Sequence, residues 1–339
     1  MKTLLNSGSE IIITEPLELI DVVSSTNCFS ANGWSYEVAK KYLFSFEGKI
    51  IEAGFYKHYA DEKMSRFVKQ VIELPTSYGC PMKCAYCASS HIDSFSSLTT
   101  ELLCRITDIL MDSNDIPNND EILVTLTGTG DAFFTMGLIS EYISGISQKY
   151  CNLCFTISSC NWTKGMLKII EELSARYKFR NIQFTYISSD EVLVKRVIMG
   201  LQCIDYQPLD LIEHIANSPL CNWRINYLML QSINDDDASF VEFAEMIKPI
   251  KDKVIVRISS LNETAASIVN GLKPSTIQRS RVLQNILKQN GVDAYLFFSE
   301  HNDNMNCGQL VLENSLRKWN KHANFCETDR RYSNTTLMI

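Results

Sequence analysis

Short apolar runs alternate with amphipathic stretches along most of the chain, and this alternation predicts the fold. Six runs rich in β-branched and aromatic residues have the length of buried strands, namely 71–76, 122–127, 154–158, 182–187, 223–230 and 254–259. Helical periodicity fills the gaps, at 98–111, 137–149, 164–177, 191–198, 238–250 and 275–289. Six strand–helix units in series predict an α/β protein with a parallel sheet, either doubly wound or closed fully or partly into a barrel. In both architectures the chemistry gathers at the carboxyl ends of the strands.

The residues on either side of this series follow another pattern. Two runs, 41–46 and 50–55, flank Glu47-Gly48 and predict a β-hairpin ahead of the strand–helix units. A last strand is expected at 292–298. The first 35 or so residues and the tail after Leu312 carry no pattern that predicts an element. We therefore expect an N-terminal extension over 1–70, a main α/β unit over 71–312 and a tail over 313–339.

Composition places the chain among ordinary acidic globular proteins. It has 339 residues, of which 45% are hydrophobic and 21% charged, with 32 Lys and Arg against 39 Asp and Glu and a net charge of −7. No apolar run approaches the roughly 18 residues of a membrane span, so we expect a cytoplasmic protein with no membrane partner. The negative total argues against broad, sequence-independent binding of nucleic acid, although a local basic groove is compatible with it.

The cysteines are numerous, and three of them are closely spaced. Cys80, Cys84 and Cys87 form C-x3-C-x2-C directly after the first strand, whereas the other nine of the twelve are scattered. Three thiolates on one loop can bind three irons of a 4Fe–4S cluster and leave the fourth iron open. An open iron can chelate the amino and carboxylate groups of S-adenosylmethionine and pass an electron to its sulfonium. The alternatives are a zinc site, which needs a fourth ligand, or three unrelated core cysteines.

This spacing, with Tyr86 before the third cysteine, resembles the radical-SAM superfamily. Polar residues at the ends of later strands fit an S-adenosylmethionine pocket. Gly130 permits close backbone approach, and Asp131 can accept from the methionine ammonium or simply cap the helix that follows. Small polar residues at strand ends either bind ribose and carboxylate groups or cap helices, and Ser158, Thr185 and Asn262 occupy such positions.

The segment Asn306-Cys307-Gly308-Gln309-Leu310 makes the resemblance more specific. With it, the sequence resembles the RlmN/Cfr family of class A radical-SAM RNA adenine methylases from about Lys41 to Leu310. The matching elements occur in family order: Ile51-Glu52-Ala53, the cysteine loop, the Gly-x-Gly-acid loop, 156–159, 227–230, 233–235, Asn262 and C-G-Q-L. The resemblance implies a partial (β/α)6 radical-SAM barrel of parallel strands with a small N-terminal hairpin extension.

The same resemblance implies roles for individual residues. The C-G-Q-L cysteine, here Cys307, takes a methyl group from one S-adenosylmethionine, and a 5′-deoxyadenosyl radical from a second abstracts hydrogen from that methyl. Glu52 falls at the family's proton-accepting glutamate, and Cys80, Cys84 and Cys87 hold the cluster. The positions of the S-adenosylmethionine contacts are Gly130, Asp131, Ser158, Thr185, Tyr186, Ile187 and Asn262. From the residues alone, Cys307 could equally be a buried thiol and Glu52 an exposed strand carboxylate. A flavodoxin- or ferredoxin-type reductant is the implied partner.

The chain departs from the family at chemically important positions. The family's second catalytic cysteine is replaced by Glu73, which can take a proton but cannot form the disulfide that releases the product; Cys28 is our first candidate for a substitute thiol. Asp131 replaces a glutamate, and Arg257 and Ser260 replace an asparagine and a proline. The family's N-terminal helical RNA-binding module is reduced to about 35 residues, with 36–43 as its candidate helical remnant.

Three functions follow from this pattern. The first is a radical-SAM methyltransferase that uses Cys307 to functionalise an sp2 carbon of a purine-like or other small molecule. The second is a true RNA methylase acting at adenine carbon 2 or carbon 8, which needs a basic rim to grip an extruded base. The third is a non-catalytic sensor that binds the cluster and S-adenosylmethionine. A surface charge map separates the first two.

Overall fold

The computed structural model describes residues 16–31, 34–92, 94–114, 116, 120–200, 207–300 and 311. The strands are β1 Glu18–Ala31, β2 Trp34–Phe46, β3 Lys49–Tyr59, β4 Phe67–Glu73, β5 Ser77–Tyr78, β6 Ser96–Ser97, β7 Ile122–Leu126, β8 Leu153–Ser159, β9 Phe179–Tyr186, β10 Trp223–Met229, β11 Val254–Ser260 and β12 Ala294–Glu300. The helices are α1 Thr100–Ser113, α2 Met136–Lys149, α3 Lys164–Ser174, α4 Glu191–Val197, α5 Pro208–Asn217, α6 Asp237–Ile247, α7 Ala265–Val269 and α8 Ile277–Gln289. Short 3₁₀ turns include η1 Ala88–His91 and η2 Ala132–Thr135.

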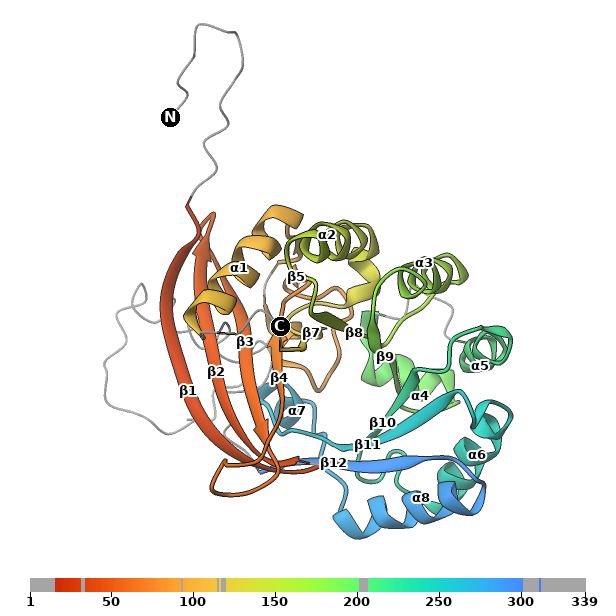
Figure 1. Ribbon diagram of the computed structural model, residues 1–339. Coiled ribbons are helices and arrows are strands. Elements are labelled where there is room, and N and C mark those ends of the chain that lie inside the picture. The colour runs from red at the N-terminus through yellow and green to blue at the C-terminus, as the bar shows by residue number, and fades with distance from the viewer. Residues whose placement is uncertain are drawn as a thin grey trace, which may run out of the picture.

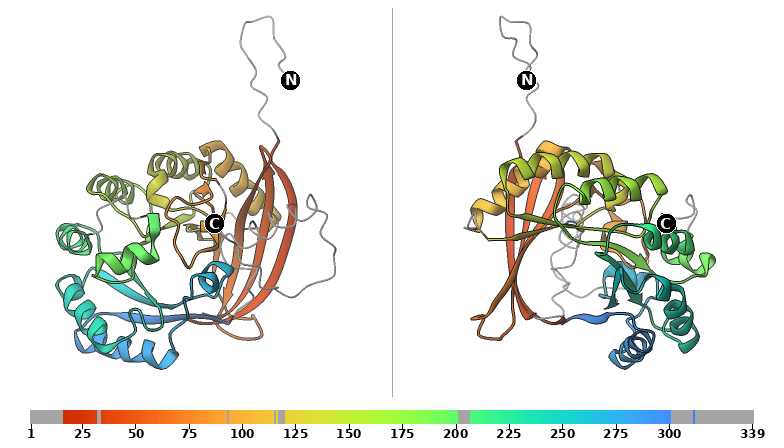
Figure 2. Two further views of the ribbon diagram at one scale, coloured as in Figure 1. Left: turned by 180° about the vertical axis from the view of Figure 1, so that it is seen from behind. Right: turned by 45° about the vertical axis from the view of Figure 1, so that its right-hand side comes forward.

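Ten strands form one closed barrel in the order β1-β12-β11-β10-β9-β8-β7-β4-β3-β2. The strands from β4 to β12 along this order are parallel, as the strand–helix series predicts. Helices cover the outside of this parallel part, and the long strands β1 to β3 form an antiparallel wall opposite (Figures 1 and 2). The α/β barrel is thus confirmed, and the structure adds that the N-terminal strands complete it.

The hairpin prediction is confirmed, with β2 and β3 paired in register from Phe46 opposite Lys49 outward. Glu47 and Gly48 both have positive φ, 49° and 72°, as a two-residue turn of the primed type requires. The helical interpretation of 36–43 is wrong, because these residues belong to β2 and alternate between the two faces of the sheet. The expected boundary at residue 70 falls inside β4.

Strand β1 and helix α5 have no counterpart in the sequence prediction, and neither do the short elements β5, β6 and α7. Strand β1 pairs with β2 over most of its length and with β12 through Cys28 opposite Glu300, which closes the barrel. Helix α5 begins with Pro208 at its first turn, a position that tolerates proline because the missing N–H has no helical partner there. Within the described residues, no helix is long and apolar enough to cross a membrane.

The main core lies outside the barrel, between the strands and the helices. Its strand residues include Ile72, Val124, Phe155, Phe184 and Val256, all at most 1% exposed. Since side chains alternate along a strand, the residues between them face the interior. Those residues are largely polar or charged, and they include Glu73, Thr125, Thr156, Gln183, Asn226 and Arg257. The polar inner face is therefore where a functional site is expected.

Candidate active site

The cysteine loop follows β4 at the carboxyl edge of the parallel strands, and backbone hydrogen bonds hold it from several sides. Thr76 N donates to Thr129 O (2.8 Å), which ties the loop to the Gly-x-Gly segment after β7. Ala85 N donates to Val197 O (2.8 Å) at the end of α4. The Thr264 hydroxyl donates to Tyr86 O (3.0 Å) from the segment after β11. Elements distant in sequence thus converge on this loop.

The three loop thiols are close enough to affect one another. Burial, followed by repulsion from Cys84 and Cys87, raises the pKa of Cys80 well above its usual range. Burial is also the largest cause that raises the pKa of Cys87, to about 11. Within the described residues no three potential ligand side chains share metal-binding geometry. The raised pKa values of Cys80 and Cys87 favour the neutral thiols in the metal-free protein, and a bound cationic iron site would favour the thiolates instead.

A fourth cysteine lies beside the loop. Cys160 directly follows β8, and its Sγ is 3.9 Å from Sγ of Cys84. Both thiols are buried. The sequence analysis placed Cys160 among the scattered cysteines, since its 76-residue separation from Cys84 gives no motif.

Asp131 performs the capping role that was one of its two predicted interpretations. Its Oδ1 accepts from Phe133 N (3.0 Å), which caps η2, and from the Ser159 hydroxyl (2.7 Å). Its Oδ2 accepts from Cys160 N (3.0 Å) and from the Cys160 thiol (3.4 Å). A carboxylate offers about four acceptor positions. The contact of Asp131 with a methionine ammonium stays a prediction. Such a contact would displace one of these four donors, and the Cys160 thiol is the weakest donor among them.

Gly130 is packed against the strand that leads into the cysteine loop. Its φ is +108°, and a Cβ on it would lie 2.3 Å from the hydroxyl oxygens of Thr76 and Ser77. Any side chain here would push the two loops apart. The glycine is thus explained by the approach of one loop to the other, whether or not a cofactor also contacts it.

The remaining residues predicted to contact S-adenosylmethionine divide into two groups. Ser158 and Thr185 are on inward-facing positions of β8 and β9, and the Ser158 hydroxyl accepts from the Gln183 amide (2.8 Å). Asn262 follows β11, two residues before Thr264. By contrast, the Tyr186 ring packs against Tyr227 and Phe243 in the outer core. Ile187 is fully buried, and its carbonyl accepts from Asn234 (2.8 Å), so only backbone groups at 186 and 187 can reach the interior.

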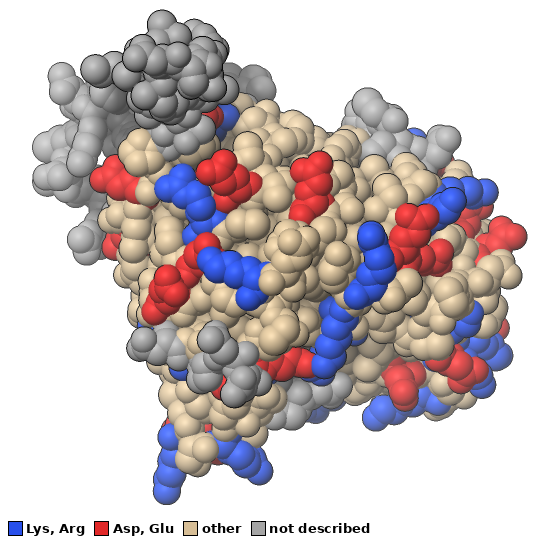
Figure 3. Space-filling model, turned by 45° about the horizontal axis from the view of Figure 1, so that its top comes forward, with Lys and Arg blue, Asp and Glu red and all other residues tan. Residues whose placement is uncertain are grey.

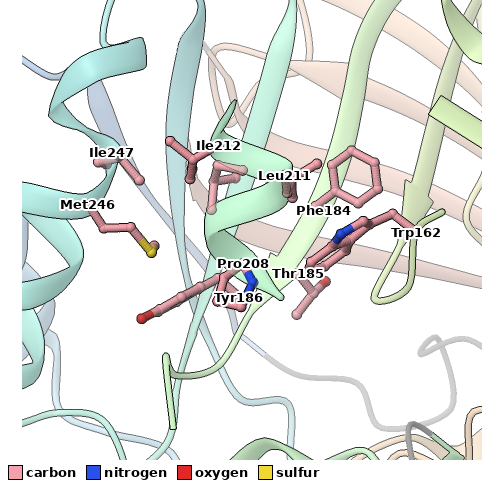
Figure 4. Close-up of a pocket in the computed structure, with 10 residues that line it drawn as sticks. Trp162, Phe184, Thr185, Tyr186, Pro208, Leu211, Ile212, Met246 and Ile247 are labelled. Carbon is pink, nitrogen blue, oxygen red and sulfur yellow. The ribbon is translucent and has the colours of Figure 1, made fainter. Parts of the chain in front are cut away.

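One small cavity lies behind these residues, on the helix side of the sheet. Trp162, Phe184 and Tyr186 line it together with apolar residues of α5 and α6 (Figure 4). It has room for about one water molecule. The cavity is a gap in the outer core and is too small for a cofactor.

The predicted catalytic carboxylates come together on the inner face. Lys41 Nζ is 2.9 Å from Oε1 of Glu52 and 2.5 Å from Oε2 of Glu73. The Lys41 side chain is 1% exposed, and those of Glu52 and Glu73 are 3% and 13% exposed. The Tyr56 hydroxyl donates to Oε2 of Glu73 (2.7 Å). The exposed-strand interpretation of Glu52 is therefore wrong, and Lys41 and Tyr56 are site residues that the sequence analysis missed.

Strand register explains this grouping. Lys41 pairs with Gly54, and Gly54 pairs with Glu73, so the three residues form a row across β2, β3 and β4. Gly54 has no side chain to separate the other two. A Cβ on it would lie 2.7 Å from the Tyr56 hydroxyl. The same row continues through Thr125 to Thr156, and Thr127, two residues beyond Thr125, donates to Oε1 of Glu73 (3.4 Å).

Cys307 lies outside the described residues, but Val311 close after it is described. Val311 is 1% exposed and packs with Leu43 and Ile50. These two residues are the inward-facing neighbours of Lys41 and Glu52, two positions along β2 and β3. Val311 therefore lies on the inner face, beside the layer that holds the carboxylates.

The first candidate for a substitute thiol lies away from this group. Cys28 pairs with Tyr36, whereas Val23 is the β1 residue opposite Lys41. The five positions between Val23 and Cys28 correspond to about 16 Å along the strand. The register thus places the Cys28 backbone far from Glu73 along the barrel axis.

Comparison with known proteins agrees with this site. The chain has a TM-score of 0.67 to the crystal structure of a radical SAM methyltransferase from Sphaerobacter thermophilus, with 16% identity and coverage of 87% of this chain and 81% of that one. The barrel and its cysteine loop therefore define a fold of the radical-SAM methyltransferase type. Enzymes of this class use a 4Fe–4S cluster and S-adenosylmethionine, which Cys80, Cys84 and Cys87 and the adjoining strand ends would hold.

The sequence relatives are more specific. The chain is 24% identical over 285 residues to a probable dual-specificity RNA methyltransferase RlmN of Clostridium botulinum (strain Loch Maree), covering 80% of this chain and 75% of the relative. It is 23% identical over 293 residues to a probable RlmN of Pseudothermotoga lettingae, covering 84% and 79%. No protein-family model matches the chain. These relatives confirm the resemblance that the motifs indicated.

Proposed function

We propose that the chain is a radical-SAM methyltransferase that functionalises an sp2 carbon of a small molecule, with Cys307 as the methyl carrier. The observation that carries the proposal is the buried group Glu52, Lys41 and Glu73 on the inner face of the barrel. Val311, which follows the C-G-Q-L segment, packs one layer away from it. Val311 and the proposed proton-accepting groups therefore lie on the same inner face of the barrel.

The side chains have distinct tasks in this proposal. The bound cofactors supply the methyl group and the radical chemistry, and a flavodoxin- or ferredoxin-type protein supplies the electron. The Cys307 thiol loses its proton and accepts the methyl group on sulfur. Once the methyl-derived carbon is bonded to the substrate, the adduct would have to lose one electron, which the cluster would take back, and the hydrogen on the substrate carbon as a proton, for which Glu52 or Glu73 is the proposed acceptor. Lys41 orients both carboxylates through its two ion pairs.

An RNA substrate is the second candidate, and the names of the sequence relatives favour it. Two features favour a small molecule instead. In the part of the chain that the structure describes, pairing of β1 with β12 closes the side of the barrel, which leaves the ends of the barrel as routes for a substrate. On the face shown in Figure 3, basic side chains stand among acidic ones without forming a continuous basic surface.

The test is to incubate anaerobically reconstituted enzyme and a reductant with methyl-labelled S-adenosylmethionine and fractionated cell extract. We expect label in the small-molecule fraction. Label in RNA alone would select the second candidate. Cys307→Ala should abolish S-adenosylhomocysteine formation while slow 5′-deoxyadenosine formation persists, and Cys221→Ala, which removes an exposed thiol, should change neither product. Equal S-adenosylhomocysteine from the Cys307 variant would contradict the proposed carrier.

A further inference from the structure

Two arginines face the interior of the barrel below the cofactor edge. Arg257 is on β11 and Arg224 on the neighbouring β10, both on the inward-facing positions that alternate with the core residues Val256 and Ile225. Both side chains are only partly accessible to solvent. Arg257 stands where the RlmN/Cfr family has asparagine, so this charge is a feature of this chain.

The charge of these arginines has no counterpart among the described residues. The guanidinium of Arg257 lies over the Phe297 ring, 3.7 Å from its centroid, and donates no hydrogen bond to any described residue. Arg224 donates only to the Tyr295 hydroxyl (3.3 Å) and, with the Asn181 amide turned to satisfy its contacts, to that amide oxygen (3.2 Å). In the described part of the chain no carboxylate lies within 4 Å of either guanidinium. A confined cation without a counter-charge is costly, and a bound anion would remove that cost.

We infer that Arg257 and Arg224 bind an oxyanion group, phosphate or carboxylate, of a small-molecule substrate inside the barrel. The inference rests on the proposed function and specifies its substrate class. Planar guanidinium groups suit bidentate contact with such oxyanions. Arg257 precedes the end of β11 at Ser260 by three residues, about 10 Å along the strand. A molecule of nucleotide size can therefore place its anionic end at the arginines and its reacting ring near the cofactor edge.

The test measures binding to the reconstituted full-length enzyme with S-adenosylmethionine bound. Calorimetric titrations use AMP, adenosine, nicotinate and a short RNA oligonucleotide as probes. We expect AMP or nicotinate to bind and adenosine to bind at least 10-fold more weakly. Binding of AMP would identify the oxyanion group as phosphate, and binding of nicotinate would identify it as carboxylate. Arg257→Gln should lower the affinity for the anion about 10- to 100-fold, because the substitution removes a charge-assisted hydrogen bond. Arg281→Gln, on the exposed face of α8, is the matched control and should bind like wild type.

A second readout separates an anion site from a structural role. Without ligand, Arg257→Gln should melt at the same temperature as wild type or higher, because it removes an uncompensated charge. Inorganic phosphate should raise the melting temperature of wild type more than that of the variant. A destabilised variant with an unchanged phosphate effect would overturn the inference. So would weakened S-adenosylmethionine binding by the variant, which would assign Arg257 to the cofactor, or RNA binding that depends on Arg257 as strongly as AMP binding.

Failure of this inference is distinguishable from failure of the proposed function. Methyl transfer to Cys307 in the absence of substrate tests the carrier role and does not involve the arginines. Normal methylation of Cys307 in wild type and in Arg257→Gln, with no anion binding in either, would overturn the anion site alone.

Discussion

Lys41 of β2 reaches across Gly54 of β3 to Glu73 of β4, with 2.5 Å between Nζ and Oε2. The resemblance in sequence aligns Glu73 with the second catalytic cysteine of the RlmN/Cfr family, the residue that releases product there. The same ammonium also binds Glu52. On this alignment, we expect a buried network of one cation and two carboxylates where the family has a thiol.

Lys41→Met should destabilise the protein and stop turnover. Glu52 and Glu73 would then lie close together without their shared cation, and breaking a buried pair in this way costs about 3–5 kcal/mol. Urea unfolding measures this loss, with Lys63→Met in the exposed turn after β3 as the control. Adding Glu73→Gln to Lys41→Met should restore part of the stability, because one unpaired charge is removed. An unchanged unfolding midpoint for Lys41→Met would show that the network is not formed.

Replacing any one of Cys80, Cys84 and Cys87 by Ala should abolish cluster binding. Wild-type protein reconstituted under anaerobic conditions should contain about four irons per chain and absorb broadly in the visible range. Cys104→Ala and Cys221→Ala, which remove thiols from other parts of the barrel, should leave the iron content unchanged. Stoichiometric zinc with no iron would refute the cluster assignment.

Glu73→Cys should speed release of product if wild type retains a methylene bridge between Cys307 and its substrate. The contacts of Glu73 with Lys41, Tyr56 and Thr127 show that position 73 faces the barrel interior, as this experiment requires. Mass spectrometry of the Cys307 peptide after turnover should show substrate plus one carbon in wild type and less of that adduct in the variant. Glu101→Cys on the exposed face of α1 is the control. Repeated turnover without the adduct that persists when every cysteine other than Cys80, Cys84, Cys87 and Cys307 is replaced would require another release step.

Stability should fall below pH 6.5 because of His58. Burial, followed by the nearby charge of Lys69, lowers the pKa of His58 from 6.5 to about 2, and the Glu37 carboxylate beside its ring acts in the opposite direction. Between these values the unfolded chain binds a proton that the folded chain does not, so the free energy of unfolding falls as the pH falls, by up to about 1.4 kcal/mol per unit.

The measurement for this prediction compares urea unfolding at pH 7.5 and pH 5.5. Wild type should lose about 1 kcal/mol more than His58→Gln between the two values. Equal losses in the two proteins would mean that His58 takes up a proton in the folded state as readily as in the unfolded chain.

Several features of the fold and site could be predicted because their signals are local. The strand–helix series follows from residue periodicity, and Glu47-Gly48 specifies a turn with two positive φ angles. Cys80, Cys84 and Cys87 are within eight residues, so their proximity does not depend on the rest of the fold. Strand β1 was missed because its sequence shows no clear alternation. Leu19, Ile20 and Val22 remain exposed in the structure. The strand is held by its pairing with β2 and β12, which the pattern of residues does not show.

The sequence by itself determined the order of the strands and helices, the cysteine loop and the candidate carboxylates. Only the tertiary structure decided which of these residues meet. The network of Lys41, Glu52 and Glu73 depends on the register of three strands, Cys160 reaches Cys84 from another strand end, and Arg224 and Arg257 face the inside of a barrel that β1 closes. The physical reason is that strand periodicity identifies which residues share a face, whereas register and closure set which faces and rows oppose one another.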